Sequence, residues 1–127
     1  MTSKFDNETK TLYLIQGDSG YLYVGGLNPQ KRFKVYFGIY DDKRNIVGEE
    51  LDEENKENEG FVEFSFLPSY TSKLAVPVNK KEQVYKYAIK VHELGTTDAD
   101  TMNIGGGEMG EEYDVVVYPQ RIKGYFQ

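Results

Sequence analysis

The chain has 127 residues, no cysteine and a formal net charge of −6 at pH 7. This length predicts one domain, which buries about two thirds of the surface that its unfolded chain exposes. The lack of cysteine excludes disulfides, thiol catalysis and cysteine-ligated zinc. The acidic balance argues against a nucleic-acid partner and against an anionic membrane surface, because both attract clustered lysine and arginine.

The first residues are polar and lack the apolar core of a signal peptide. No run of about 18 apolar residues is present, so we expect no membrane span. We expect synthesis in a cytoplasm. Residues 1–10 are predicted to form a flexible arm or a fraying strand anchored by Phe5, and residues 11–127 to form the domain.

A Gly-Asp-Ser-Gly corner at residues 17–20 organises the first part of the chain. It lies between two segments of strand character, Thr11–Gln16 and Tyr21–Leu27. Gly17 and Gly20 can take a positive φ without a Cβ clash, which suits a tight turn. We therefore predict that the two segments form the first hairpin.

The clearest alternation of apolar and polar residues lies at Arg32–Tyr40, where one face carries Phe33, Val35, Phe37 and Ile39. A period of two predicts a half-buried strand. Phe61–Leu67 and Gln83–Val91 alternate in the same way, and Tyr113–Tyr118 suggests a strand covered on both faces. The remaining expected segments are a short strand at Ile46–Gly48, one helical turn within Pro68–Leu74, an extended edge at Val76–Val78 and a last strand at Ile122–Phe126.

Two segments are predicted to be loops. Glu49–Gly60 is a run of acidic residues with one lysine, and we interpret it as a solvated, mobile loop. Calcium binding is the alternative there, but the run lacks the spaced ligands and central glycine of an EF-hand. His92–Glu112 is a long connection that contains Gly105, Gly106 and Gly107.

Together these elements predict an all-β protein, a single antiparallel β-sandwich of about seven to nine strands with one long glycine-rich loop. A small barrel is the alternative architecture. The 11 tyrosines and 7 phenylalanines, with no tryptophan, favour strands and also suit contact surfaces.

The residues of this chain do not compose an active site. Gly-Asp-Ser-Gly strings surround nucleophilic serines in some proteases, which makes Ser19 a candidate, but a triad needs a histidine and His92 is the only one. The many acids could supply a glycosidase pair, yet most lie in the expected mobile loop. Gly105–Gly107 does not lead from a strand into a helix and is no phosphate cradle. We expect no enzyme, no cofactor and no metal, and therefore a function through contact.

A series of short landmarks points to a family. The series is Gln16–Gly20, Val35–Ile39, Gly60–Phe64, Thr71–Leu74, Tyr85–Ile89 and Ile122–Phe126. It resembles the small β-sandwich domains of tailed phages of Gram-positive hosts, typified by the N-terminal domain of the baseplate upper protein. The resemblance covers most of residues 11–126 and is carried by short motifs.

The resemblance implies a virion structural protein that docks on a larger assembly. Its partners would be a major capsid protein or a tail or baseplate protein, with further copies of the chain as a second kind of partner. The chain ends about where the sandwich ends, without a helical stalk or receptor-binding domain. This favours a capsid decoration protein or a tail or baseplate accessory.

A carbohydrate-binding or adhesin module is the alternative function. It is suggested by the tyrosine-rich strands Tyr21–Tyr23 and Tyr36–Tyr40. Such modules present aromatic platforms to sugars, often with tryptophan, which this chain lacks.

Overall fold

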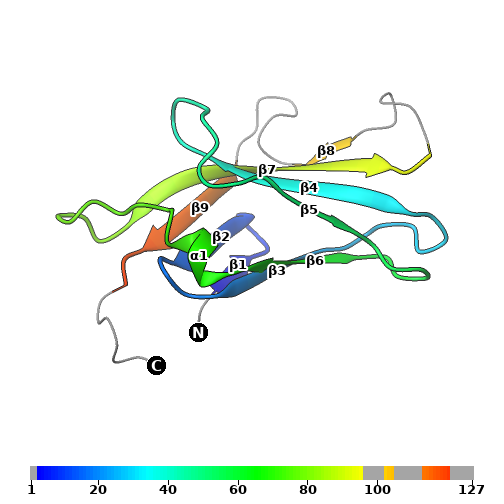
Figure 1. Ribbon diagram of the computed structural model, residues 1–127, viewed down its shortest axis with the longest axis horizontal. Coiled ribbons are helices and arrows are strands. Elements are labelled where there is room, and N and C mark those ends of the chain that lie inside the picture. Colours follow the sequence, from blue (N-terminus) through cyan, green and yellow to red (C-terminus); the bar gives the residue numbers. More distant parts are fainter. Residues whose placement is uncertain (1–2, 96–101, 105–112, 121–127) are drawn as a thin grey trace.

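The computed structural model describes residues 3–95, 102–104 and 113–120, with only the backbone of residues 102–104 (Figure 1). In these ranges nearly every element is a strand, which confirms the all-β class. The strands are β1 (Ser3–Asp6), β2 (Thr11–Ile15), β3 (Gly20–Val24), β4 (Phe33–Tyr40), β5 (Leu51–Glu54), β6 (Val62–Phe66), β7 (Gln83–Glu93), β8 (Met102–Ile104) and β9 (Tyr113–Tyr118).

The larger sheet has the strand order β1-β2-β9-β7-β4-β5. The long strand β7 pairs through Gln83–Tyr87 with β9 and through Ile89–Val91 with β8. All pairs are antiparallel except β2–β9, which is parallel with Leu12 opposite Val115. The expectation of a purely antiparallel structure is therefore wrong at this pair. Because β2 and β9 come from opposite ends of the chain, no hairpin constrains their direction.

A second sheet contains β3 and β6, paired antiparallel with Leu22 opposite Phe64. The predicted hairpin of the segments around the Gly-Asp-Ser-Gly corner is wrong, because β2 pairs with β1 and β9 whereas β3 pairs with β6. The corner carries the chain from one sheet to the other. Gly17 has φ +83°, and a Cβ on Gly20 would lie 2.9 Å from the Cβ of Ser3, so both positions need glycine.

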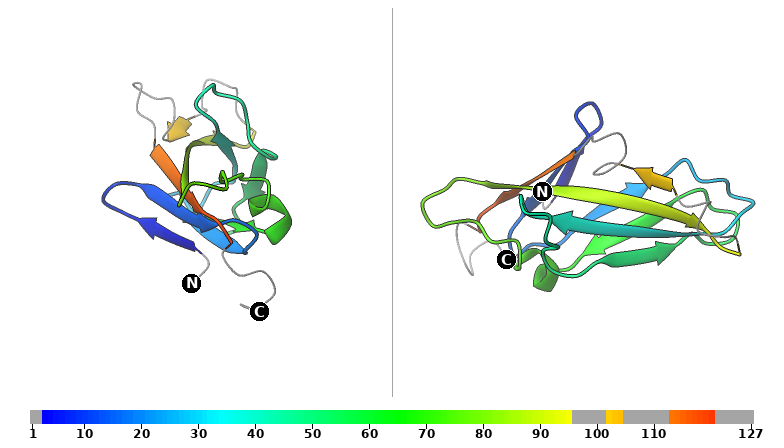
Figure 2. Two further views of the ribbon diagram at one scale, coloured as in Figure 1. Left: turned by 90° about the vertical axis from the view of Figure 1, so that its left-hand side faces the viewer. Right: turned by 90° about the horizontal axis from the view of Figure 1, so that it is seen from above.

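One hydrophobic core lies between the two sheets. The larger sheet curls around it, as the end-on view shows (Figure 2, left). Val35, Phe37 and Ile89 of the larger sheet and Val62 and Phe64 of the smaller one belong to the same buried cluster, and Phe33 packs at its border. The alternation predicted for β4, β6 and β7 is thereby confirmed. Three consecutive valines of β9 are buried, as expected for a strand covered on both faces: Val115, Val116 and Val117.

The acidic run at residues 49–60 is not wholly a loop. It contains β5, which pairs with β4 so that Glu53 lies opposite Val35 and Asp52 opposite Tyr36. Cross-strand ion pairs stabilise this edge, since Lys34 contacts Asp52 at 4.0 Å and Arg32 contacts Glu54 at 3.6 Å. β5 carries only one apolar residue, so hydrophobic alternation could not reveal it.

Three other expectations differ from the structure or are refined by it. The predicted long connection at 92–112 contains the end of β7 and the short strand β8, while residues 96–101 and 105–112 lie outside the described residues. For residues 1–10 the sequence left a flexible arm or a strand as alternatives, and in the structure Ser3–Asp6 is a strand paired with β2. Instead of a strand at 46–48, an isolated bridge joins Ile46 to Tyr40. The predicted strand at 122–126 lies outside the described residues.

The expected helical turn is α1, at Pro68–Thr71. Leu67 is its N-cap and makes no side-chain capping bond, so neither Ser69 nor Thr71 caps it. Thr71 instead donates from its buried hydroxyl to the carbonyl oxygen of Asp18 at 2.7 Å, which ties the turn to the Gly-Asp-Ser-Gly corner. No helix in the described part of the chain could cross a membrane.

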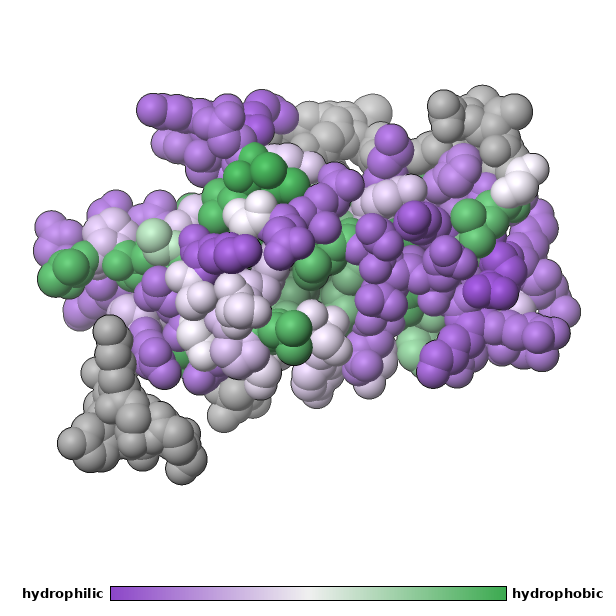
Figure 3. Space-filling view, in the orientation of Figure 1, coloured by the Kyte–Doolittle hydropathy of each residue, from purple (hydrophilic) through white to green (hydrophobic). Residues whose placement is uncertain are grey.

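The surface seen from the viewpoint of Figure 1 is largely hydrophilic, with small separate hydrophobic groups (Figure 3). Other exposed apolar residues are scattered along the chain, mostly in the connections between elements, among them Ile46, Leu67, Val78, Val84 and Leu94. Scattered exposed apolar residues of this kind are normal for a soluble domain. A concentration of exposed aromatic rings occurs only at the β3–β6 sheet among the residues described.

Candidate binding surface

Three aromatic rings form an exposed aromatic cluster on the outer side of the β3–β6 sheet: Tyr21, Tyr23 and Phe61. Because Gly20, Leu22 and Val24 face the core, the alternation of β3 directs both tyrosines outward, where they are 55% and 57% exposed. Phe61 precedes β6 and is 40% exposed. The ring centroids of Tyr21 and Tyr23 are 5.6 Å apart, and those of Tyr23 and Phe61 are 5.8 Å apart.

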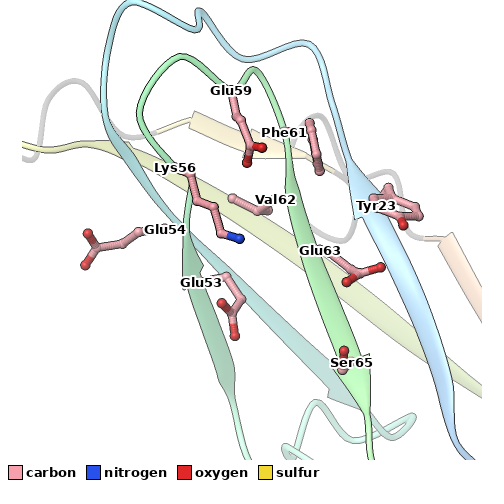
Figure 4. Close-up of a pocket in the computed structure, with 9 residues that line it drawn as sticks. All are labelled: Tyr23, Glu53, Glu54, Lys56, Glu59, Phe61, Val62, Glu63 and Ser65. Atoms are coloured by element: carbon pink, nitrogen blue, oxygen red, sulfur yellow. The ribbon is translucent and has the colours of Figure 1, made fainter.

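A groove adjoins this cluster where β5 and β6 diverge (Figure 4). Its cavity volume is about 480 Å³, which is within the range of ligand-binding clefts. β5 and the connection that follows it contribute one wall, and β6 with the neighbouring residue of β3 contributes the other. The lining residues are Tyr23, Glu53, Glu54, Lys56, Glu59, Phe61, Val62, Glu63 and Ser65.

The position of Glu53 follows from the register of β5. It lies opposite the buried Val35, so its side chain is on the core side of the larger sheet, yet it is exposed. This is possible because the two sheets are not joined by hydrogen bonds between β5 and β6. In Figure 4, Glu53, Lys56 and Glu59 point into the gap between these strands, whereas Glu54 points away.

The connection from β5 to β6 is held by the buried side chain of Asn55. Its amide nitrogen donates to the carbonyl oxygens of Lys31 at 2.9 Å and Glu59 at 2.8 Å. Its amide oxygen accepts the N–H of Phe33 at 2.7 Å. The end of the groove that carries Lys56 and Glu59 is therefore anchored to the start of β4.

The groove is negatively charged. Four of its lining residues are glutamates and one is a lysine. Tyr23 hydrogen-bonds to Glu63, and this bond together with the negative charge of the carboxylate raises the pKa of Tyr23. Glu54 is neutralised by Arg32 outside the gap. Among the described residues, Glu53, Glu59 and Glu63 form no ion pair.

The described residues contain no cluster of three or more histidine, cysteine, aspartate or glutamate side chains that could hold a metal ion. For the acidic run, this means that its resolved carboxylates do not converge as calcium ligands do. What the surface offers is contact area from aromatic rings, hydrogen-bond acceptors and negative charge.

The candidate catalytic residues adjoin different sheets. Ser19 is exposed in the corner before β3, and its neighbour Gly20 pairs with Phe66. His92 lies on β7 opposite Lys34, on the outer face of the larger sheet. Gly105–Gly107 lies outside the described residues.

The two tyrosine-rich strands proposed for sugar binding are also separate. Tyr21 and Tyr23 belong to the β3–β6 sheet. Tyr36 and Tyr40 are half-buried on β4 of the larger sheet, and the ammonium of Lys34 lies 5.6 Å from the ring centroid of Tyr36. The two pairs therefore do not form one platform.

Sequence reasoning missed that Phe61, Glu63 and Glu53 border the same surface as Tyr23. Part of the signal was present, because the outward positions of Phe61–Leu67 include Glu63 and Ser65. The pairing of β3 with β6 brings Glu63 opposite Tyr23, and this pairing is long-range. The predicted hairpin of Thr11–Gln16 with Tyr21–Leu27 left no place for this pairing.

No protein-family model matches the chain, and a search of curated proteins gives no match.

Proposed function

We propose that the chain is a non-enzymatic structural protein of a tailed-phage virion. It docks on a capsid, tail or baseplate assembly as a decoration or accessory component. In this proposal the two sheets form a β-sandwich like that of the family which the sequence resembles, and the β3–β6 sheet faces the neighbouring protein.

The observation that carries the proposal is the exposed aromatic cluster of Tyr21, Tyr23 and Phe61. Tyrosine and phenylalanine are enriched in protein–protein interfaces, because their rings provide large contact areas at a small cost in side-chain entropy. Two of the three rings lie on strand β3 and the third directly precedes β6, so docking needs little ordering of the backbone. Repetition of such contacts around a particle allows a modest interface to suffice.

Particle association tests the proposal. Virions purified from a host that carries this gene are analysed by mass spectrometry for the chain. The proposal predicts that it is present in a constant ratio to the major capsid or tail protein. Its absence from purified particles, while it is expressed in the same cells, would contradict the proposal.

A matched pair of variants connects this test to the surface. Tyr21→Ser combined with Tyr23→Ser removes two exposed rings and should reduce the amount of chain on particles. Val78→Ser is the control, because Val78 is a fully exposed apolar residue on a different segment. Equal incorporation of both variants would exclude the aromatic cluster as the docking surface.

Carbohydrate binding is the second candidate, because two exposed tyrosines lie beside carboxylates and Ser65. The ring orientations weaken it. Tyr21 and Tyr23 are inclined by 75° and Tyr23 and Phe61 by 64°, so the cluster is not a flat platform for stacked sugar rings. Binding on a glycan array that is lost in the Tyr21→Ser, Tyr23→Ser variant would support this function, and an array without binding would remove it.

A further inference from the structure

Three glutamates of the groove between β5 and β6 lack the ion pairs that several other acids of the described surface form. Lys31 pairs with Glu93 at 3.2 Å, Lys73 pairs with Glu49 at 3.6 Å, and Lys86 pairs with Asp114. Glu53, Glu59 and Glu63 form no ion pair among the described residues. The groove thus presents three carboxylates without an ion pair, and Lys56 is the one cation among its lining residues.

Aromatic rings beside these carboxylates add a second attraction for a cation. A lysine or arginine within about 6 Å of an aromatic ring centroid is stabilised by the ring's electron-rich face. In the described part of the chain, Lys4 makes this contact with Tyr13 at 5.9 Å and Lys34 makes it with Tyr36 at 5.6 Å. Tyr23, whose ring borders the groove, makes no such contact among the described residues.

The strands that border the groove have unpaired edges. β5 pairs only with β4, and β6 pairs only with β3, within the described ranges. β5 and β6 lie too close together for another strand to fit between them, so an extended peptide would lie over the groove and place its side chains against both walls. A second copy of this chain is disfavoured there, because its net charge of −6 would oppose the glutamates.

From these observations we infer that the groove between β5 and β6 binds a basic, extended segment of a partner protein. A lysine or arginine of that segment lies between the carboxylates of Glu53 and Glu63 and against the ring of Tyr23. Arginine suits the site better, since its guanidinium has five donors and can reach separated acceptors. The inference rests on the proposed function and adds to it the place and chemistry of docking.

Lys56 competes with the cation of the partner segment for the carboxylates of the groove. Its side chain points into the gap between β5 and β6 and is the one cation among the lining residues (Figure 4). It weakens the attraction of the groove for another cation, so Lys56→Met should strengthen binding. This expectation is specific, because removing a lysine elsewhere changes the net charge equally without clearing the gap.

The experiment uses a short fluorescent peptide of alternating arginine and threonine, titrated with the whole chain at low salt and followed by polarisation. The groove variant combines Glu53→Gln, Glu59→Gln and Glu63→Gln. The control variant combines Glu8→Gln, Glu50→Gln and Glu82→Gln, three exposed acids outside the groove, and thus changes the net charge by the same amount. Thermal unfolding verifies that each variant is folded.

The groove variant should bind about tenfold or more weakly than the native chain, the control less than about twofold more weakly, and Lys56→Met more tightly. Added salt should weaken native binding. Equal losses in the two triple variants would mean that only net charge attracts the peptide, and this would overturn the inference. No binding to the native chain would overturn it too. If the groove variant does not fold, the inference is tested with two other variants. Lys56→Met should bind the peptide more tightly, and the more conservative Tyr23→Leu should bind it more weakly because the ring is missing.

The particle test separates this inference from the proposed function. If the chain is present on particles and the peptide binds without regard to the groove, the inference is wrong and the proposed function remains. If the peptide binds in the groove but the chain is absent from particles, the proposed function is wrong and the basic-segment site remains.

Discussion

The ring of Phe37 on β4 packs against the ring of Phe64 on β6, with their centroids 5.7 Å apart. This contact joins the larger sheet to the β3–β6 sheet. Phe37 also contacts Phe66 at 5.3 Å and Tyr87 at 5.7 Å, and it is fully buried. The two sheets therefore hold each other through the side chain of one central residue and its neighbours, and the exposed surface of β3–β6 depends on that packing.

Phe37→Ala tests this dependence. The variant leaves a large cavity between the sheets and should lower the free energy of unfolding by about 3–5 kcal/mol. Val78→Ala, at a fully exposed position, should change it by less than about 0.5 kcal/mol. Urea denaturation followed by circular dichroism measures both. A loss below about 1 kcal/mol for Phe37→Ala would show that the sheets do not share a cooperative core.

Asn55→Ala removes three hydrogen bonds of a buried side chain and leaves the N–H of Phe33 without its partner. We expect a loss of about 2–4 kcal/mol in unfolding free energy, since each unsatisfied buried group costs about 1–3 kcal/mol. Amide hydrogen exchange should increase at Phe33 in particular. Asn45→Ala is the control, because Asn45 is exposed and bonds to Asp41 through its backbone. Similar stability of the two variants would contradict the anchoring role of Asn55.

Tyr70→Phe and Tyr85→Phe form a contrasting pair. The buried hydroxyl of Tyr70 has no hydrogen-bond partner among the described residues, whereas that of Tyr85 donates to the carbonyl oxygen of Ala75 at 2.6 Å. Removing the Tyr70 hydroxyl should leave stability unchanged or raise it by up to about 1 kcal/mol, and removing that of Tyr85 should lower it by about 1 kcal/mol. Thermal unfolding of the two variants under one condition gives the comparison. A larger loss for Tyr70→Phe would reverse the assignment.

Alkaline pH should destabilise the fold through buried tyrosines. Burial raises the pKa of Tyr70, Tyr85 and Tyr87 above the ordinary value of 10.0. Above about pH 10 the unfolded chain therefore binds fewer protons than the folded one, so stability falls as pH rises, while below this pH the contribution is fully present. Urea midpoints measured across this range should decline, and less steeply in Tyr87→Phe. A flat profile above pH 10 would contradict the burial of these phenols.

Much of the fold follows from local pattern. The alternation in β4, β6 and β7 predicted both their existence and the residues that face the core, because a period of two is imposed by the strand itself. The strand β5 escaped prediction, because three of its four side chains are acidic and it therefore shows no hydrophobic alternation. The pairing of the strands was the least predictable feature of the fold. Nothing in the residues around Gly17 distinguishes a turn within one sheet from a crossing between two sheets.

The candidate binding surface was predictable only in part. The outward direction of Tyr21 and Tyr23 follows from their alternation with Leu22 and Val24. Their proximity to Glu53 and Glu63 does not, because it depends on the β3–β6 pairing and on the divergence of β5 from β6. Both relationships are set by packing of the whole core and leave no mark at the level of local sequence.

Cryo-electron microscopy of the intact particle tests the central proposal, docking through the β3–β6 sheet, most directly. We predict density for this chain with Tyr21, Tyr23 and Phe61 covered by a neighbouring virion protein and a basic segment of that neighbour along the β5–β6 groove. A particle in which the β3–β6 sheet faces solvent, or which lacks the chain, would contradict the account.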